Sequence, residues 1–217
     1  MDTCGGRRLM AGFMLLASAS PRRHEILTQL GVAHGVLHVP APEGEDEPRL
    51  AHEPAVEYVC RTARNKALHA HAWLHAGGRP ASIPPDWPIQ WHQCPILCAD
   101  TTVTVDGQVL GKPADEADAA RMLRLLSGRR HQVLTAVALW ARGRLWEALS
   151  ASDVDVEALA EPDIAAYIAS GEPFGKAGAY AIQGRAAAFI TRLEGSYTGV
   201  MGLPAHETMM LLRSAAA

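Results

Sequence analysis

The sequence predicts a single α/β domain in which helices flank a mixed β-sheet. Three observations indicate this class. Short apolar runs that suit strands alternate with longer segments whose apolar residues recur at helical spacing. The pair Asp106-Gly107 lies between two of the apolar runs and predicts a tight hairpin, so the sheet is not purely parallel. With 217 residues, the chain is long enough to bury a sizeable core and still fits one domain.

The first half of the chain predicts two strands and two helices. A buried strand at residues 13–17 leads to a helix that has Ser20 as its N-cap, Pro21 at its first position and Gly31 at its end. The expected elements after it are a strand at 36–39, an acidic loop at 41–54 and a helix from 55 to about 74. Residues 76–95 are rich in glycine and proline, and we interpret them as a surface insertion.

The second half predicts hairpins that alternate with helices. In chain order, the expected elements are a strand at 96–99, a hairpin of 102–105 with 108–110, a helix at 115–126, long strands at 132–140 and 145–156, a helix at 162–169, a strand at 187–193, a glycine-rich loop at 195–202 and a helix from 204 to about 213. Arg142-Gly143 supplies the turn between the two long strands.

The N-terminus allows two interpretations. Arg7-Arg8, the apolar run after them and Ala17-Ser18-Ala19 have the layout of a short secretory signal. The alternative is the buried strand at 13–17, and we favour it because cleavage would cut through a segment with candidate functional residues. Residues 1–11 are then a flexible extension and 12–217 form the domain, which we expect to be cytoplasmic.

The composition argues against several classes of protein. Acidic residues outnumber basic ones by 23 to 20, and no basic stripe is interleaved with aromatic residues, so we expect no nucleic-acid partner. No apolar run approaches the ~18 residues that cross a bilayer, so we expect no membrane partner. The four cysteines do not make a disulfide framework, and Cys60 and Cys98 fit apolar patterns as core residues.

Serine and arginine side chains mark the start of the first predicted helix. Ser18, Arg22 and Arg23 lie where a strand ends and a helix begins, and the free N–H groups and dipole of a helix N-terminus attract anions. Arginine is also suited to bidentate contacts with phosphate. The alternative is a capped surface helix with two solvated arginines, and these residues alone leave both interpretations open.

Charged residues in three further segments could belong to the same site. Asp100, followed by Thr101, comes after a predicted buried strand and could bind a divalent metal, act as a general base or satisfy turn amides. Lys66 and Lys112 would each be a solvated charge alone, but with the arginines they could clamp a polyanion. The acidic run that ends at Glu47 is either a solvated loop or the source of a second metal carboxylate.

The segment 176–184 carries a glutamine in an apolar, glycine-containing context. The amide of Gln183 could be aimed at the edge of a ligand, because an amide both donates and accepts hydrogen bonds as recognition of a base requires. The alternative is a buried amide that pairs with the backbone.

These segments resemble, in their order along the chain, the motifs of the Maf family of nucleoside triphosphate pyrophosphatases. Each motif is weak alone, but the ordered set is specific and covers nearly all of residues 13–212. The matching stretches are 16–23, 61–67, 99–101, 111–113, 122–131, 176–184, 195–197 and 200–204.

The resemblance implies a fold similar to that of inosine triphosphatase, with a deep substrate cleft. It implies hydrolysis between the α and β phosphates of a nucleoside triphosphate, with a divalent metal such as Mg²⁺ or Mn²⁺. Asp100 would be the catalytic base or a metal-holding carboxylate, and Glu47 would be the second metal carboxylate. The positions that match phosphate- or substrate-holding residues of the family are Ser18, Arg22, Lys66 and Lys112. A homodimer is compatible with the resemblance.

Three positions favour one branch of the family. Arg22, Thr101 and Gln183 match the branch similar to dTTP/UTP pyrophosphatases, whereas the 7-methyl-GTP branch tends to have Trp, Gln and Glu there. A 7-methyl-GTP or broad nucleotide specificity, or a nucleotide-sensing role in cell division, stays open as an alternative. Two departures bear on the site: Gly175 stands where the family usually has Asp, and Ala181 stands where it usually has Gly.

Overall fold

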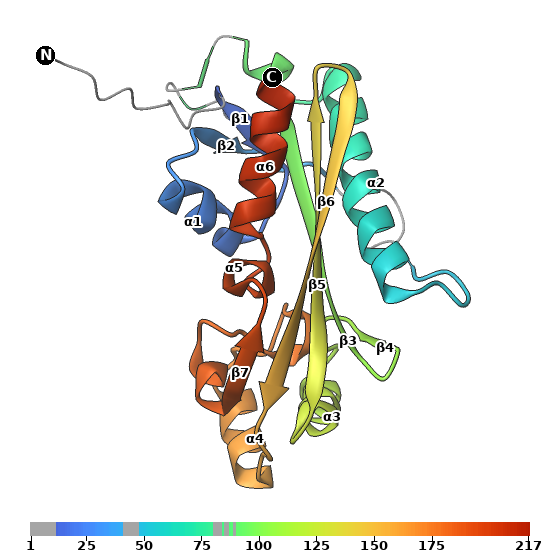
Figure 1. Ribbon diagram of the computed structural model, residues 1–217, viewed down its shortest axis with the longest axis vertical. Coiled ribbons are helices and arrows are strands. Elements are labelled where there is room, and N and C mark those ends of the chain that lie inside the picture. The colour runs from blue at the N-terminus through green and yellow to red at the C-terminus, as the bar shows by residue number, and fades with distance from the viewer. Residues whose placement is uncertain (1–11, 41–47, 80–83, 85–86, 89) are drawn as a thin grey trace, which may run out of the picture.

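The predicted fold class is confirmed by a computed structural model, which describes residues 12–40, 48–79, 84, 87–88 and 90–217. A mixed seven-stranded open sheet has helices on both faces (Figure 1). Its strand order is β2-β1-β3-β5-β6-β7, and β4 pairs with β3. The strand β1 runs parallel to β2 and β3, and every other pair is antiparallel. The predicted extension at 1–11 and the candidate ligand Glu47 lie outside the described residues.

The strands follow the apolar runs of the sequence. They are β1 Met14–Leu16, β2 His34–Val36, β3 Ile96–Val105, β4 Gln108–Leu110, β5 Arg130–Ala141, β6 Arg144–Val156 and β7 Ile190–Glu194. Both predicted hairpins form. The left-handed φ angles of Asp106 and Gly107, 49° and 75°, and of Arg142 and Gly143, 52° and 71°, fit such tight turns.

The helices begin and end near the predicted signals. They are α1 Pro21–Gln29, α2 Ala55–His75, α3 Glu116–Leu126, α4 Glu161–Ala169, α5 Tyr197–Val200 and α6 Ala205–Ala216. Short 3-10 turns lie at η1 Trp91–Gln93, η2 Ala177–Ala179 and η3 Arg185–Phe189. No helix in the described part of the chain is both long and apolar enough to cross a membrane.

The structure corrects the predicted break between residues 96–99 and 102–105. Both belong to β3, because β5 pairs with it continuously from Ile96 to Thr104. Asp100 and Thr101 therefore lie inside a strand, and the expectation of a carboxylate at a strand end is wrong. The polar residues there suggested a turn, but the alternation of side chains between the two faces continues through them.

Three smaller boundaries also differ from the prediction. The second strand is His34–Val36, not 36–39. The small residues before Phe189 form η3, so the last strand begins at Ile190. The loop at 195–202 contains α5, because the Ser196 hydroxyl accepts a hydrogen bond of 3.0 Å from Gly199 N–H and caps the turn.

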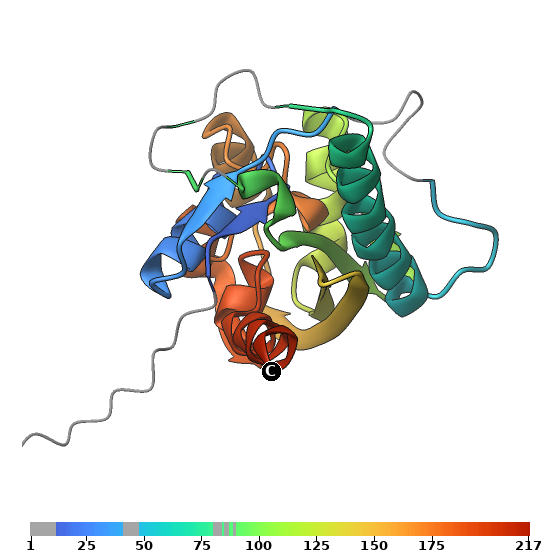
Figure 2. The ribbon, with the colours of Figure 1, turned by 90° about the horizontal axis from the view of Figure 1, so that it is seen from above.

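The core divides into two lobes along β3, β5 and β6. In the first lobe, α1 and α6 pack on one face of the sheet and α2 packs on the other (Figure 2). Leu97 and Ala99 of β3 belong to the core on the α1 and α6 side, whereas Ile96 and Cys98 belong to the core on the α2 side. In the second lobe, α3, α4 and η2 pack around the other end of these strands (Figure 1).

The described part of residues 76–95 packs against the first lobe. Trp91 is buried, and its ring lies 5.6 Å from that of Trp87, which lies 5.6 Å from Phe13. A Cβ atom at Gly35 would overlap the Trp87 indole, so glycine in β2 is what lets this ring approach the strand.

One titratable side chain is buried near the second-lobe core. The Nε2 atom of His131 lies 2.8 Å from the Tyr180 hydroxyl, and its Nδ1 atom has no partner among the described residues. Burial lowers the pKa of His131 to about 4, although Asp155 and Asp153 act in the opposite direction. The ring is therefore neutral in the folded protein, and its protonation favours the unfolded chain, where the pKa is about 6.5.

Replacement of His131 is predicted to flatten the acid side of the stability profile. The free energy of unfolding of the wild type should fall as the pH drops from about 6.5 towards 4, and His131 should account for roughly 2.5 kcal/mol of that fall by pH 4.5. Urea unfolding of the wild type and of His131→Gln at pH 7 and pH 4.5 measures this share. Equal pH-dependent losses in both proteins would contradict the prediction.

Candidate active site

The site is built on an unpaired stretch of one edge of β3. On this edge, β1 pairs with β3 at Ile96 and Leu97, and β4 pairs with it from Val103 onward. Within the described chain, no strand covers the edge between Leu97 and Val103, whereas β5 covers the other edge throughout. The loop that leaves β1 passes this gap and carries Ser18 into α1. Groups from β3, the loop after β1, α1 and α2 therefore meet at this edge, which stays open in the described part of the chain.

Asp100 projects towards α2 and meets a lysine. The Nζ atom of Lys66 lies 2.5 Å from Oδ1 of Asp100. The carboxylate side chain is 15% exposed and the lysine side chain is 39% exposed, so the pair is open to solvent on the lysine side. Lys66 is held there because Ala63, Ala67 and Ala70 on its helix are small and buried, which brings α2 close to the sheet.

Arg23 points inward from the other face and ties three segments together. Its Nε atom donates to the Gly202 carbonyl at 2.8 Å, and Nη1 donates to Ser18 Oγ at 3.1 Å. The Nη2 atom makes a longer contact of 3.5 Å with Thr101 Oγ1. Ser18 Oγ also accepts from Ser20 N–H at 3.2 Å, so the loop after β1 is ordered by the same group.

A row of hydroxyl groups continues from Arg23 across the sheet. Thr135 donates to the Gly199 carbonyl at 2.8 Å and lies 3.0 Å from the Thr101 hydroxyl. Because the single proton of Thr135 is used on Gly199, Thr101 must donate to Thr135 and accept from Arg23. The chain of donors therefore has one direction, which lets its members polarise one another.

The charge of Arg23 is stabilised by a nearby carboxylate. Burial lowers the pKa of Arg23 below its usual value, and the Asp100 carboxylate acts in the opposite direction. An arginine remains protonated at neutral pH even so. Among the described residues, the site therefore holds two cations, Arg23 and Lys66, around one anion, Asp100. That arrangement leaves net positive charge for a polyanion.

The remaining predicted residues are placed less centrally. Arg22 lies on the outer side of α1, where its Nη1 atom bonds to Glu25 at 2.8 Å. Lys112 follows β4 and is exposed, and its neighbour Gly111 accepts a hydrogen bond of 3.0 Å from Gly178 N–H. Gln183 is half-buried in the second lobe. The structure thus brings Ser18, Arg23 and Thr101 together, and Lys66 with Asp100. Lys112 and Gln183 lie on the second lobe.

The two departures from the family pattern have local explanations. Gly175 has a φ of 75°, which glycine adopts without strain, and Lys176 Nζ bonds to the carbonyls of Glu172 and Phe174 at 3.3 Å instead of to a carboxylate at 175. Ala181 does not have a positive φ, whereas Ala179 has a φ of 59°. Alanine at 181 therefore does not strain the loop that carries Gln183.

Sequence reasoning missed the anchor of the loop before α2. Glu53 is buried and accepts hydrogen bonds of 2.6 and 2.8 Å from Arg61 and one of 3.1 Å from Leu50 N–H. The Arg61 hydrogen bonds lower the pKa of Glu53 to about 2 against the effect of burial. Glu53 lies in the loop before α2, so no helical spacing links it to Arg61, and this pair has no signal in the sequence.

The metal-binding capacity of the site rests on one described carboxylate. Asp100 uses Oδ1 for Lys66, and its other oxygen makes no hydrogen bond within the described part of the chain. No group of three metal-ligating side chains occurs among the described residues. Mg²⁺ is usually held by one or two carboxylates together with substrate phosphates, so Asp100 fits such an ion without a complete protein cage.

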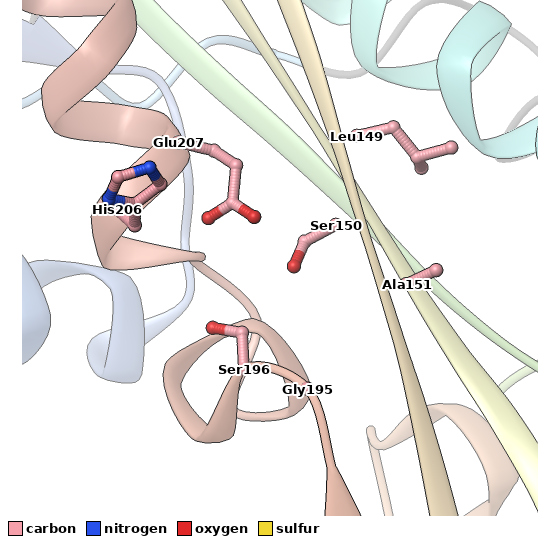
Figure 3. Close-up of a pocket in the computed structure, with 7 residues that line it drawn as sticks. All are labelled: Leu149, Ser150, Ala151, Gly195, Ser196, His206 and Glu207. Atoms are coloured by element: carbon pink, nitrogen blue, oxygen red, sulfur yellow. The ribbon is translucent and has the colours of Figure 1, made fainter.

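A separate hollow of about 450 Å³ lies on the α6 side of β6 (Figure 3). Ser150 and Glu207 point towards each other across it, whereas Leu149 and Ala151 point to the opposite face of the strand (Figure 3). Among the described residues, its lining contains no lysine or arginine, and one Glu207 oxygen is buried without a hydrogen-bond partner. An anionic hollow of this kind is unsuited to a triphosphate, so the candidate site is the open edge of β3.

Comparison with known proteins gives concordant matches. The family model described as "Maf-like protein" matches residues 13–215. A protein of Bordetella parapertussis named dTTP/UTP pyrophosphatase is 57% identical over 202 residues, which cover 93% of this chain and 92% of the relative. Proteins of the same name from Burkholderia pseudomallei, 51% identical over 208 residues, and Ralstonia nicotianae, 50% identical over 206 residues, match 94% of this chain and 93% and 94% of their own lengths.

The two adjacent arginines are predicted to differ in their effect on stability. Arg23→Ala removes the donor for the Gly202 carbonyl and two hydroxyl contacts, so the free energy of unfolding should fall by ~2–3 kcal/mol. Arg22→Ala removes an exposed i, i+3 ion pair and should cost less than ~1 kcal/mol. Urea unfolding at pH 7 compares the two variants. Equal losses would show that Arg23 is not the structural link described.

Proposed function

This chain belongs to the Maf family, and from that premise we propose that it is a nucleoside triphosphate pyrophosphatase that hydrolyses dTTP and UTP. The products would be the nucleoside monophosphate and pyrophosphate. The proposal is supported by relatives of that name at 50–57% identity over about 93% of the chain. At this identity and coverage, we expect this chain and its relatives to arrange the same residues in the same way.

The observation that carries the proposal is the Asp100–Lys66 pair at the uncovered edge of β3. A triphosphate carries three to four negative charges near neutral pH, so it needs cations on a surface that its chain can reach. Lys66 on one side of β3 and Arg23 on the other bracket the edge, and the N-terminus of α1 adds free N–H groups beside Ser18. Lys112, at the end of β4, follows along the same edge.

Asp100 is suited to act as the general base. Its carboxylate would take a proton from a water molecule that attacks the α-phosphorus, and the bond from that phosphorus to the bridging oxygen would break as pyrophosphate leaves. Lys66 holds the carboxylate in place and adds positive charge where charge builds up on the phosphates. Ser18 and Arg23 would fix the phosphate chain relative to Asp100.

A divalent cation such as Mg²⁺ or Mn²⁺ is part of the proposal. Asp100 would hold it through the carboxylate oxygen that Lys66 does not use, and Glu47 is the proposed second carboxylate. When bound, such an ion neutralises phosphate charge and helps to orient the triphosphate. Because the substrate is a free nucleotide, we expect the reaction to take place in the cytoplasm.

Base choice is proposed to depend on Gln183. Within the described residues its side-chain amide makes no hydrogen bond, so both its donor and its acceptor are available. Uracil and thymine present an N–H donor next to a carbonyl acceptor, which one amide in a fixed orientation can match. Cytosine presents the reverse pattern at the same edge, so a fixed Gln183 would disfavour CTP.

Replacement of the proposed base is predicted to abolish turnover. Pyrophosphate release by the wild type should be fastest with dTTP and UTP and slower with CTP, GTP and 7-methyl-GTP. Asp100→Asn should lower kcat on dTTP and UTP by about 10²- to 10⁴-fold, because the amide does not accept the proton. Asp106→Asn is the matched control, since Asp106 is exposed in the adjoining hairpin turn. No turnover of any nucleotide by folded wild-type protein would refute the enzymatic function.

Removal of divalent metal is predicted to stop the reaction reversibly. Dialysis against a chelator should eliminate pyrophosphate release from UTP, and addition of Mg²⁺ or Mn²⁺ should restore it. Asp100→Asn should also weaken the binding of Mn²⁺ in the presence of UTP, measured by paramagnetic relaxation of water protons. Unchanged turnover after chelation would contradict the metal requirement.

A further inference from the structure

A carboxylate beyond the predicted site holds the loop that carries Gln183. Glu172 follows α4 and accepts a hydrogen bond of 2.8 Å from the Tyr167 hydroxyl. Its two oxygens also accept from the backbone N–H groups of Arg185 at 3.0 Å and Ala186 at 3.4 Å. Burial acts to raise the pKa of Glu172, but these hydrogen bonds outweigh it and the pKa is lowered overall, so the group is ionised at neutral pH.

The hydrogen bonds of Tyr167 and Glu172 hold the backbone on both sides of Gln183. Ahead of it, Ala181 N–H donates to the Tyr167 hydroxyl at 3.2 Å. Behind it, Arg185 N–H and Ala186 N–H donate to Glu172. Gly184 N–H donates to the Ala181 carbonyl at 3.0 Å, which closes a turn with Ile182 and Gln183 in its central positions. Both ends of the turn are therefore fixed to one Tyr–Glu pair.

The glycine after Gln183 leaves room for the Glu172 carboxylate. A Cβ atom at Gly184 would lie 2.4 Å from the carboxylate carbon and both oxygens of Glu172, which is far inside van der Waals contact. Gly184 has a φ of −108°, so a side chain here would disturb the carboxylate and would not strain the backbone. We call the hydrogen bonds of Tyr167 and Glu172 to this turn the clamp. Tyr167 is buried and its ring lies 5.7 Å from that of Phe189, so packing holds its hydroxyl in place.

We propose that Glu172, together with Tyr167, is a positioning residue that fixes the orientation of Gln183 and thereby sets the preference for uracil and thymine over cytosine. This inference rests on the proposed function, in which Gln183 faces the base. An amide in a mobile turn can present its donor or its acceptor to either base, whereas a clamped turn presents one pattern. Selectivity then depends on a carboxylate that never touches the substrate.

Substitution of Glu172 should alter base choice more than catalysis. In Glu172→Gln, one carboxylate oxygen becomes an NH₂ group that cannot accept from a backbone N–H. One end of the turn loses its partner, so KM for UTP and dTTP should rise about tenfold and the preference for UTP over CTP should shrink by a similar factor. The value of kcat should stay within about threefold, because Asp100 and Lys66 belong to the first lobe.

Tyr167→Phe provides a second variant with an intact core. It keeps the buried ring and removes only the hydroxyl that accepts from Ala181 and donates to Glu172. The same change in KM and in the UTP-to-CTP ratio is expected, and the double variant should be no worse than either single one because the two groups act as a unit. Glu161→Gln is the matched control, since Glu161 at the start of α4 pairs with Arg124 on the surface.

Combining Glu172→Gln with Gln183→Ala tests whether Glu172 acts through Gln183 or through a general effect on the structure. Gln183→Ala should itself reduce the UTP-to-CTP ratio, and Glu172→Gln added to Gln183→Ala should change the ratio no further. A further loss of selectivity in that background would overturn the inference. So would a fall in kcat for all nucleotides with an unchanged ratio in Glu172→Gln.

Hydrogen exchange distinguishes a failed clamp from a failed functional assignment. The amides of Ala181, Arg185 and Ala186 should exchange at least tenfold faster in ligand-free Glu172→Gln than in the wild type or Glu161→Gln. If the wild type shows no preference for UTP over CTP, the proposed function and this inference fall together, even where exchange confirms the clamp. If the wild type is selective and the exchange rates do not differ, only the inference is wrong.

Discussion

The gap in the pairing of β3 is the constraint on which the site depends. Within the described chain, β3 is paired on one edge and open on the other between Leu97 and Val103. Consecutive side chains of this stretch point to opposite faces of the sheet. Asp100 therefore meets Lys66 of α2, while Thr101 meets Arg23 of α1. If a strand covered this edge, both contacts could survive, but the backbone between them would no longer be open to a phosphate chain.

The half-buried Arg23 orders the part of the candidate site that is proposed to hold the phosphates. Its partners come from the loop after β1, from β3 and from the loop after α5, so one guanidinium joins segments that are far apart in sequence. The position of Gly202 requires a φ of 114°, which an L-amino acid with a side chain rarely adopts, and this turn aims the carbonyl at Arg23. Groups already held in place do not have to be ordered during the reaction.

Local sequence patterns predicted most helices and strands. Which side chains come together at the site was predicted only through the resemblance to a family. Helical spacing, the N-terminal Ser20-Pro21 pair and the two glycine turns were sufficient to place α1, α2, α3, β5 and β6. The continuity of β3 was missed because Asp100 and two threonines interrupt an apolar run, and only the pairing with β5 makes them strand residues. Long-range partners such as Thr135, Glu172 and Glu53 carry no local signal, since their roles are set by tertiary contacts.

The proposed function places catalysis and recognition of the base on different lobes. The Asp100–Lys66 pair depends on the packing of α2 against β3 and β5, whereas the turn that carries Gln183 is held by Tyr167 of α4 and by Glu172. The strands β3 and β5 contribute residues to the cores of both lobes and so join them. The two departures from the family pattern, Gly175 and Ala181, lie near the turn that carries Gln183 and not in β3 or α2, which hold the Asp100–Lys66 pair. Under the proposed function, substitutions around Gln183 are therefore expected to change which nucleotide is selected without changing the reaction.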